Sequence, residues 1–126
     1  MEGVTHSESF SITELARHFD VTPRTIRFYE GEGLIAPKRR GTVRLYSRAD
    51  RTRLAWILRG REVGFSLAEI RELLDLYEPG PGRRGQLQAT LEKCRARIAA
   101  LKQQRDAIDL TIAELDQFCA SITAKL

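Results

Sequence analysis

The amino-acid sequence, 126 residues long, predicts a mainly α-helical fold in two parts, and three observations carry that prediction. Two short amphipathic helices are expected on either side of a turn of about three or four residues near Asp20. A strictly alternating stretch, Val43 to Tyr46, predicts a short β-hairpin. From residue 86 onward, apolar side chains recur at alternating spacings of four and three. The predicted architecture is a winged helix-turn-helix domain over 11–78, a linker over 79–85 and a coiled-coil dimerisation helix over 86–126.

The first helix is expected over residues 12–19. Ser11 supplies a capping oxygen, and Glu14, three residues later, completes the capping box that marks a helix start. Residues 1–10 show no helical periodicity and carry neither the basic start nor the apolar run of a secretory signal. We therefore expect them to be a flexible leader, and the chain to stay in the cytoplasm.

The second helix is the segment best suited to reading DNA. Thr22 provides a hydroxyl cap, and Pro23 occupies the first helical position, where its missing N–H costs nothing. Arg24 and Arg27 follow on the outward side before two glycines end the helix. In helix-turn-helix proteins the second helix enters the major groove, and its N-terminal residues contact base edges. The sequence predicts that role for this helix.

A β-hairpin wing is expected after the second helix. Residues 34–37 can run as a short extended segment, and residues 38–42 are polar and turn-like. In the alternating stretch that follows, Arg44 and Tyr46 share one face, while the two apolar residues share the other. We expect the apolar face to pack on the helices, and Arg44 and Tyr46 to look outward at the phosphate backbone.

Two further helices are marked by capping boxes, Ser47 with Asp50 and Ser66 with Glu69. Residues 60–64 separate these helices, and the turn there would form a second, smaller wing. Aromatic side chains in this region are expected to pack rather than to bind a ligand. The side chains expected in the core are Leu54, Trp56, Ile57, Leu58, Phe65, Ile70, Leu73, Leu74 and Tyr77.

Positive charge is concentrated in one window of the sequence. Between Gly33 and Arg61, nine Lys and Arg residues accompany one acidic residue, Asp50, so the window carries a net charge of +8. The whole chain carries +4, which leaves −4 for the remainder. A basic surface of this kind suits a polyanion such as nucleic acid. The alternative that the window alone leaves open is an ordinary solvated basic face.

A second chain is expected to cover the last helix. The run Glu78 to Gly82 contains two prolines and two glycines, so it stops the fourth helix and marks the domain boundary. A helix of about 40 residues would be roughly 60 Å long at 1.5 Å per residue, too long for a domain this small to cover. Packing of its narrow apolar stripe against the first domain is the alternative. The predicted dimerisation residues are Leu87, Leu91, Ile98, Leu101, Ile108, Ile112, Leu115 and Ile122.

Arg105 and both cysteines fall on the same seam. Arg105 lies near the middle and is expected to set the register, paired with Asp109 four residues on. Cys94 and Cys119 are too few and too widely spaced for a disulfide framework, which favours reduced, packed thiols. An antiparallel pairing would still bring Cys94 of one chain near Cys119 of another. No metal site or cofactor is predicted, since the histidines are isolated at His6 and His18.

Five motifs in succession resemble the signatures of one family. They are Ile12 to Ala16, Thr25 to Glu30, Gly33 to Ile35, Arg44 to Ser47 and Val63 to Ile70. In this order they resemble the MerR family of bacterial transcription regulators, without a gap from Ser11 to about Tyr77. The stretch from Arg53 to Gly60 and the turn after it resemble the LiuR-type subgroup, which is associated with the breakdown of leucine, isovalerate and related acyl-CoA compounds.

The resemblance implies a homodimer joined by an antiparallel two-helix coiled coil and bound to pseudo-palindromic promoter DNA. Family members bend and untwist that DNA to control transcription by RNA polymerase, and repression by the same binding is also common. Most basic residues are expected to contact phosphate, with base reading by one or two. Carried over by position and joined to the charge pattern, the predicted DNA-binding residues are Thr22, Arg24, Thr25, Arg27, Tyr29, Arg39, Arg40, Arg44, Tyr46 and Arg61.

Other classes of function fit the sequence less well. An enzyme is not expected, because the sequence lacks a Gly-rich phosphate loop, a nucleophile elbow and a zinc-protease motif. A DNA-architectural protein of the excisionase type would share the basic hairpin but would not need the long seam. A coiled-coil scaffold would not need the basic window. A thiol- or metal-responsive MerR sensor using Cys94 and Cys119 is kept as an alternative, although the cysteine clusters of such relatives are missing. The effector is not predicted.

Overall fold

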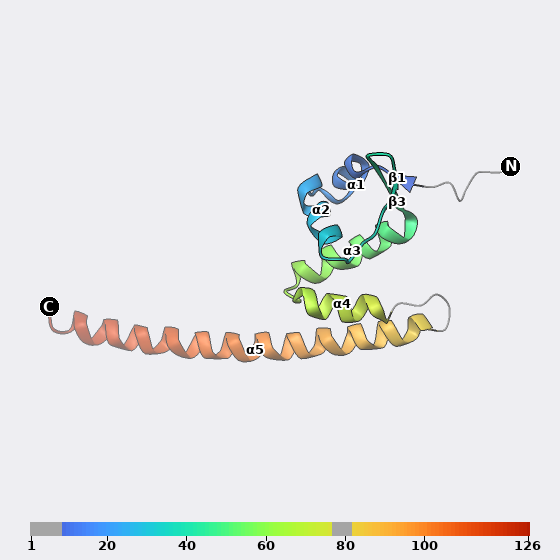
Figure 1. Cartoon of the computed structure of the whole chain (residues 1–126). Coiled ribbons are helices and arrows are strands. Elements are labelled where there is room, and N and C mark those ends of the chain that lie inside the picture. The colour runs from blue at the N-terminus through green and yellow to red at the C-terminus, as the bar shows by residue number, and fades with distance from the viewer. Residues whose placement is uncertain (1–8, 77–81) are drawn as a thin grey trace. The chain divides into compact units, whose positions relative to one another are not determined.

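The computed structural model describes residues 9–76 and 82–126. It divides the chain into a first unit, Met1–Tyr77, and a second unit, Glu78–Leu126. Within the described residues, the first unit holds four helices and a small sheet, and the second holds the long helix α5 (Figure 1). The predicted fold class, a mainly helical winged helix-turn-helix with a long C-terminal helix, is confirmed.

The helix-turn-helix pair has the predicted bounds. Helix α1 spans Ile12–Phe19, and both hydrogen bonds of the Ser11 capping box are present. Helix α2 spans Pro23–Gly31 and starts at the predicted Thr22 cap. Between them, Asp20 adopts a left-handed conformation with φ of 55°, which reverses the chain within a few residues. The two helices therefore follow each other through a tight turn, as the sequence predicts.

The wing differs from the prediction in its first strand. Lys38–Arg40, expected to be a turn, forms strand β2, and Val43–Ser47 forms β3. The turn is only the two residues 41 and 42, with Gly41 at φ of 63°, a conformation that favours glycine at the first position of a tight hairpin. The extended segment expected at 34–37 is not part of the sheet, and its Leu34 and Ile35 are buried in the core.

The sheet gains a third strand from the start of the chain. Strand β1, Ser9–Phe10, pairs antiparallel with β3, so the strand order is β1-β3-β2. The leader expected over 1–10 is therefore wrong at these two residues, and the rest of it lies outside the described residues. The guanidinium of Arg51 lies 5.2 Å from the centre of the Phe10 ring, a cation–π contact that holds β1 to α3.

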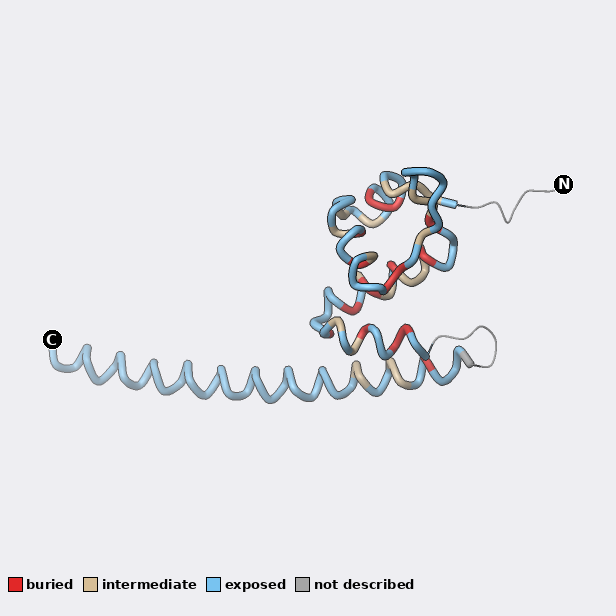
Figure 2. Tube along the Cα trace, in the orientation of Figure 1, coloured by how far each residue is buried: buried red, intermediate tan, exposed pale blue. Residues whose placement is uncertain are grey.

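Helices α3, Arg48–Glu62, and α4, Leu67–Asp75, start at the capping boxes of Ser47 and Ser66, as predicted. They approach closely at Gly60, where a Cβ would lie 3.0 Å from Cγ1 of Ile70. The buried residues of the first unit are spread over its four helices, β3 and the segment after α2 (Figure 2). Its core consists of Leu15, Ala16, Ile26, Tyr29, Leu34, Ile35, Tyr46, Leu54, Ile57, Phe65, Ile70, Leu73 and Leu74.

Of the remaining side chains expected in the core, Trp56 and Leu58 are only half-buried, and Tyr77 lies outside the described residues. Trp56 and Leu58 lie on α3 together with the fully buried Leu54 and Ile57. The predicted apolar stripe of α3 is thus correct, and its width is smaller than expected.

Helix α5 spans Gly82–Thr123 and begins earlier than predicted. The linker expected over 79–85 is wrong from Gly82 onward, and residues 79–81 lie outside the described residues. The two glycines at 82 and 85 do not prevent the helix, because a glycine lowers helix stability by only about 1 kcal/mol and the run that follows is long. In the described residues no helix is both long and apolar enough to cross a bilayer.

The predicted seam residues of α5 remain half-exposed in the single chain. The exposed fractions of the eight side chains lie between 43% and 55%. Arg105 makes a long contact of 3.9 Å with Asp106, not the predicted contact with Asp109. Both charged groups of that pair are largely exposed, so the contact contributes little to stability.

Candidate nucleic-acid interface

Helix α2 turns two arginines outward. Ile26 and Tyr29 are buried, with 0% and 7% of their surface exposed, so the opposite face of the helix is free. Arg24 and Arg27 lie on that exposed face, together with Phe28, which is 51% exposed. The first unit thus presents two guanidinium groups and one aromatic ring on a single short helix.

The two threonines of α2 stabilise its start. The hydroxyl of Thr22 accepts a hydrogen bond from the backbone N–H of Thr25 at 3.1 Å, and the two hydroxyls lie 3.0 Å apart. A cap of this kind satisfies a backbone donor that has no partner in the helix. The capping hydroxyls also stand at the N-terminal end of α2, the end that the sequence predicts to approach DNA.

Tyr29, which was expected to contact DNA, is buried. Its ring packs edge-on against Phe28, with the ring centres 5.3 Å apart, and little of its surface is open to a ligand. Phe28 instead carries the exposed aromatic surface of α2, and it was not among the predicted contacts. Its position four residues after Arg24 on the helix was the sequence signal that could have identified it.

The wing is tied to α2 through one carboxylate. Nε of Arg44 donates to Oε1 of Glu30 at 2.7 Å, and Nη2 of Arg39 donates to Oε2 at 3.0 Å. Arg39 and Arg44 face each other across the β2–β3 pair, where two like charges would otherwise repel. The hydroxyl of Tyr46 also donates to Oε1 of Glu30, at 3.4 Å. Glu30 therefore connects three side chains of the wing to the last turn of α2.

Charge and burial act in opposite directions on this carboxyl group. Burial alone would raise the pKa of Glu30, but the hydrogen bonds and charges of Arg44 and Arg39 outweigh it and lower the pKa below 4.5. Burial first, and the Glu30 charge second, raise the pKa of Tyr46 to about 12. At neutral pH the carboxyl group is ionised, and the tyrosine is protonated and able to donate.

The expected orientation of β3 is wrong. Tyr46 is fully buried, with 0% of its surface exposed, whereas Val43, expected to pack inward, is 55% exposed. Phe10 is the partner of Tyr46 in the β1–β3 pairing, and the contact with Glu30 satisfies the hydroxyl of Tyr46. Tyr46 thus supports the wing from inside, while Arg44 remains partly exposed beside it.

Several arginines of the basic window have a bond within the fold. Nη1 of Arg61 donates to the carbonyl of Phe65 at 3.1 Å, which places it beside the predicted second wing. Nε of Arg53 donates to the carbonyl of Leu34 at 2.8 Å. Arg40 lies exposed on β2. Arg53 and Arg61 therefore stabilise loops of the fold. The sequence alone does not show which arginines do this and which are available to bind a polyanion.

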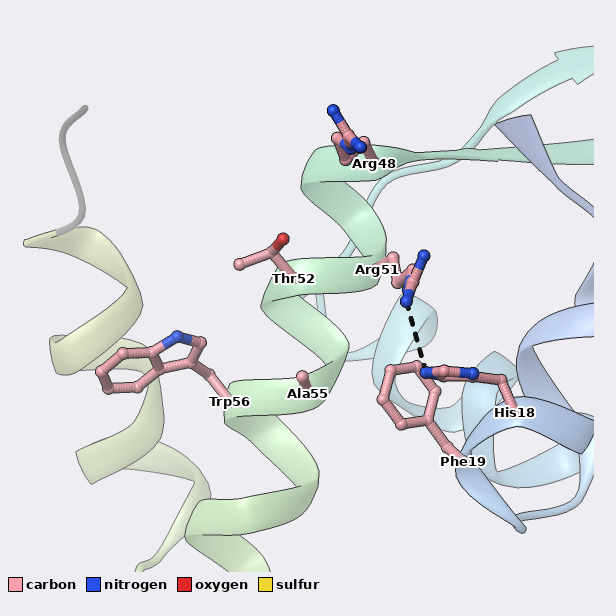
Figure 3. A pocket seen from close by; sticks show the side chains of 7 residues that line it. All are labelled: His18, Phe19, Arg48, Arg51, Thr52, Ala55 and Trp56. Carbon is pink, nitrogen blue, oxygen red and sulfur yellow. Dashed lines mark hydrogen bonds between the residues drawn. The ribbon is translucent and has the colours of Figure 1, made fainter. Parts of the chain in front are cut away.

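A shallow hollow of about 410 Å³ lies between α1 and α3 (Figure 3). His18, expected to be isolated, lies there with its Nε2 3.5 Å from Nη2 of Arg51. The half-buried Trp56 contributes part of the wall. The lining residues are His18, Phe19, Arg48, Arg51, Thr52, Ala55 and Trp56.

The cysteines do not form a site within one chain. Cys94 is half-buried and Cys119 is exposed, both as free thiols on α5. Their separation along the helix is roughly 37 Å at 1.5 Å per residue. Across the part of the chain that the structure describes, no three His, Cys, Asp or Glu side chains are grouped as metal ligands would be. His6 lies outside the described residues.

Comparison with known proteins identifies the family of this chain. A model described as "MerR HTH family regulatory protein" matches residues 10–76, and a model described as "MerR, DNA binding" matches residues 51–118. The chain belongs to the MerR family. It is therefore a MerR-type DNA-binding transcriptional regulator and not an enzyme, as the sequence predicts. Members of this family bind promoter DNA, typically as dimers.

Individual MerR proteins are similar over most of the chain. The transcriptional regulator ZntR of Escherichia coli K12 is 37% identical over 79% of this chain and 75% of its own length. The regulator PbrR691 of Ralstonia metallidurans CH34, solved in complex with lead(II), is 35% identical with a TM-score of 0.51, covering 80% of this chain and 84% of that one.

A MerR-family regulator of Bacillus cereus, 24% identical, has a TM-score of 0.66 and covers 87% of this chain and 79% of that one. At this level of identity the likeness concerns the fold alone, and it extends over most of the MerR chain described here. The LiuR-type subgroup stays a prediction, because the matched models describe the MerR family as a whole.

Proposed function

We propose that this regulator acts as a homodimer on pseudo-palindromic promoter DNA, with α2 in the major groove and the wing on the flanking phosphates. The observation that carries the proposal is the exposed face of α2 with Arg24, Arg27 and Phe28, on a helix whose Glu30 bonds the two wing arginines. An α-helix fits the width of the major groove, whereas a hairpin with arginines suits the backbone beside it.

Base reading is assigned to the middle of α2. Arg27 can donate two parallel hydrogen bonds to guanine, the commonest specific contact in the major groove. Phe28 offers an exposed ring to the methyl group of thymine. Arg24 and the hydroxyl of Thr25 lie nearer the start of the helix and are assigned to phosphate or to a neighbouring base.

Phosphate contact is assigned to the wings. Arg39 and Arg44 each use one nitrogen on Glu30, and a guanidinium carries five N–H donors, so donors remain for a phosphate. Arg40 lies exposed on the same hairpin, and Arg61 lies at the second wing. Contacts of this kind give affinity and orientation without reading sequence.

The dimer is assigned to α5. The eight half-exposed leucines and isoleucines follow spacings of four and three along one stripe of a helix, which is the pattern of a coiled-coil seam. Covering the exposed half of such a side chain contributes on the order of 1 kcal/mol, so a full seam is ample for a stable dimer. Two copies of α2 held at a fixed separation would select a two-fold site of fixed spacing.

The regulatory step and the target genes belong to the same proposal. Bending and untwisting of the promoter would present it to RNA polymerase, and the LiuR-type resemblance points to leucine, isovalerate or acyl-CoA catabolism genes. The cytoplasmic location is part of this proposal.

The test is selection of duplexes from a random pool, followed by measurement of DNA affinity at increasing salt concentration. A bound sequence with two-fold symmetry and a steep salt dependence supports the proposal, whereas weak binding without enrichment contradicts it.

Response to a thiol or metal is the second candidate function. It is favoured by the similarity to PbrR691, which was solved with lead(II), and by the two free thiols on the seam, Cys94 and Cys119. In an antiparallel dimer the two thiols would come from different chains. Cross-linking of the chains by mild oxidation that changes DNA affinity, lost in Cys94→Ser, would support it. Unchanged DNA affinity with oxidant and with lead(II) would contradict it.

A further inference from the structure

Glu30 is the only carboxylate of α2 within Pro23–Gly31, and it lies on the helix proposed to enter the DNA. A negative charge there repels the DNA backbone and lowers affinity for every duplex. Its side chain is only 20% exposed and is directed at the wing. A carboxylate in this place therefore has a task other than direct contact with phosphate.

The contacts of Glu30 show what that task is. Its two oxygens divide between the two strands of the hairpin, Oε2 bonding Arg39 of β2 and Oε1 bonding Arg44 of β3. Both bonds are charge-assisted and short, at 3.0 and 2.7 Å. The hydroxyl of Tyr46, a buried residue of β3, donates to the same Oε1. One side chain thus sets both the distance and the orientation of the wing relative to the last turn of α2.

The arginines remain competent for DNA in this arrangement. The side chain of Arg39 is 49% exposed and that of Arg44 is 26% exposed. Without the carboxylate, the two facing guanidinium groups would repel each other and adopt many rotamers. With it, they are held in a narrow range of positions, each with donors left for a phosphate.

We propose that Glu30 is a specificity-determining positioning residue, which fixes the spacing between the reading helix α2 and the phosphate-binding wing through Arg39 and Arg44. The inference rests on the proposed function of these two elements. The charge of Glu30 and the spacing that it sets can be separated by experiment, because the charge affects the affinity for every duplex and the spacing affects the affinity for the operator. Removing a negative charge strengthens binding to any duplex, whereas loss of the fixed spacing weakens binding only to the sequence that both elements must fit together.

The experiment compares two substitutions that change the net charge equally. Glu30→Gln removes the tie, and Glu32→Gln removes a carboxylate from an exposed position two residues further on. Glu32 is a suitable control because its backbone carbonyl, which accepts a hydrogen bond from Arg71 at 2.6 Å, is kept in the variant. The full chain selects an operator from random duplexes, and fluorescence anisotropy then measures affinity for this operator and for a scrambled duplex.

The ratio of operator affinity to scrambled-duplex affinity is the readout. Glu32→Gln is expected to leave this ratio at the wild-type value, because it strengthens both affinities alike. Glu30→Gln is expected to lower the ratio at least tenfold, with scrambled-duplex affinity close to that of Glu32→Gln. A ratio for Glu30→Gln equal to that of Glu32→Gln overturns the inference, since a merely electrostatic role predicts that equality.

Two further variants keep the result decisive. Glu30→Asp retains the charge but is shorter by one methylene, so it cannot hold both arginines, and it should also lower the ratio. This variant decides the question if Glu30→Gln melts at a much lower temperature than wild type. Arg44→Gln should lower the ratio less in the Glu30→Gln background than in wild type, because the two residues act together. Additive effects of the two changes overturn the inference.

Failure of the proposed function gives a different result. If the wild-type chain enriches no duplex from the pool, the proposed function is overturned and the positioning role falls with it. If the wild type enriches an operator but the Glu30 and Glu32 variants behave alike, the positioning role alone is overturned.

Discussion

At the scale of the residue, the proposed interface depends on which arginines are exposed to solvent and which are hydrogen-bonded within the fold. Arg27 lies on the exposed face of α2, while Arg44 is partly buried and bonded to Glu30. Arg53 bonds the carbonyl of Leu34 and is therefore part of the fold rather than a ligand contact. Counting basic residues in the sequence could not make this distinction, because all of them add equally to the charge of the window.

Loss of either proposed contact arginine should weaken DNA binding. Arg27→Ala and Arg44→Ala are each expected to lower operator affinity at least tenfold, about 1.4 kcal/mol, because each removes a charged contact. Arg95→Ala, an exposed arginine of α5, removes the same charge elsewhere and should change affinity much less. Fluorescence anisotropy on the selected operator measures all three. Wild-type affinity in both Arg27→Ala and Arg44→Ala would contradict the placement of the interface.

The ion pairs of Glu30 with Arg39 and Arg44 should also affect how stability depends on pH. The pKa of Glu30 is lower in the folded chain than the ordinary 4.5, so its contribution is present above pH 4.5 and is lost as pH falls through the folded value. The difference in melting temperature between wild type and Glu30→Gln should therefore shrink below pH 4.5. Thermal unfolding followed by circular dichroism measures this. A difference that is constant across this range would show that the carboxylate is not ionically tied in the fold.

At the scale of the element, helices and their caps were predictable, and the sheet was only partly so. Helices α1 and α2 have the predicted bounds because a capping residue and its partner lie three residues apart, within one turn. The polar residues Lys38 to Arg40 predict a turn, but they form strand β2, because Gly41 and Thr42 alone are enough to reverse the chain. Strand β1 has only two residues, too few for any periodicity.

The close approach of α3 and α4 predicts a strong effect at Gly60. Gly60→Val should lower the free energy of unfolding by about 1–3 kcal/mol, because the added carbons overlap Ile70 and Phe65. Gly31→Val makes the same change at the end of α2, where a Cβ would meet nothing within 4 Å. Urea unfolding of both variants tests the packing. Equal stability of the two would show that α4 can move away from α3 without loss.

At the scale of the whole molecule, α5 is the element that a single chain leaves incomplete. Its apolar stripe is half-exposed along the full seam, whereas the first unit buries its own core. A stripe of this length in water favours association with a second copy. Binding to a two-fold operator would then depend on α5 as well as on α2 and the wing.

A charge placed on the seam should separate the chains. Leu101→Glu is expected to give a monomer, because a carboxylate buried at the interface without a partner destabilises it by several kcal/mol. Leu110→Glu makes the same change on α5 at a position off the seam, where the leucine is 64% exposed, and should stay dimeric. Sedimentation velocity distinguishes the two states. Dissociation by Leu110→Glu but not by Leu101→Glu would place the interface on another face of the helix.

The helices, their caps, the basic window and the repeat of α5 could be predicted without a structure, because each is a pattern of residues that are near one another along the chain. The burial of Tyr46 and the bond between Glu30 and Arg44 could not. These contacts join residues 16 and 14 positions apart, and they depend on how β3 packs against α2. A strand pattern shows which side chains share a face, but the neighbouring elements decide which face is buried.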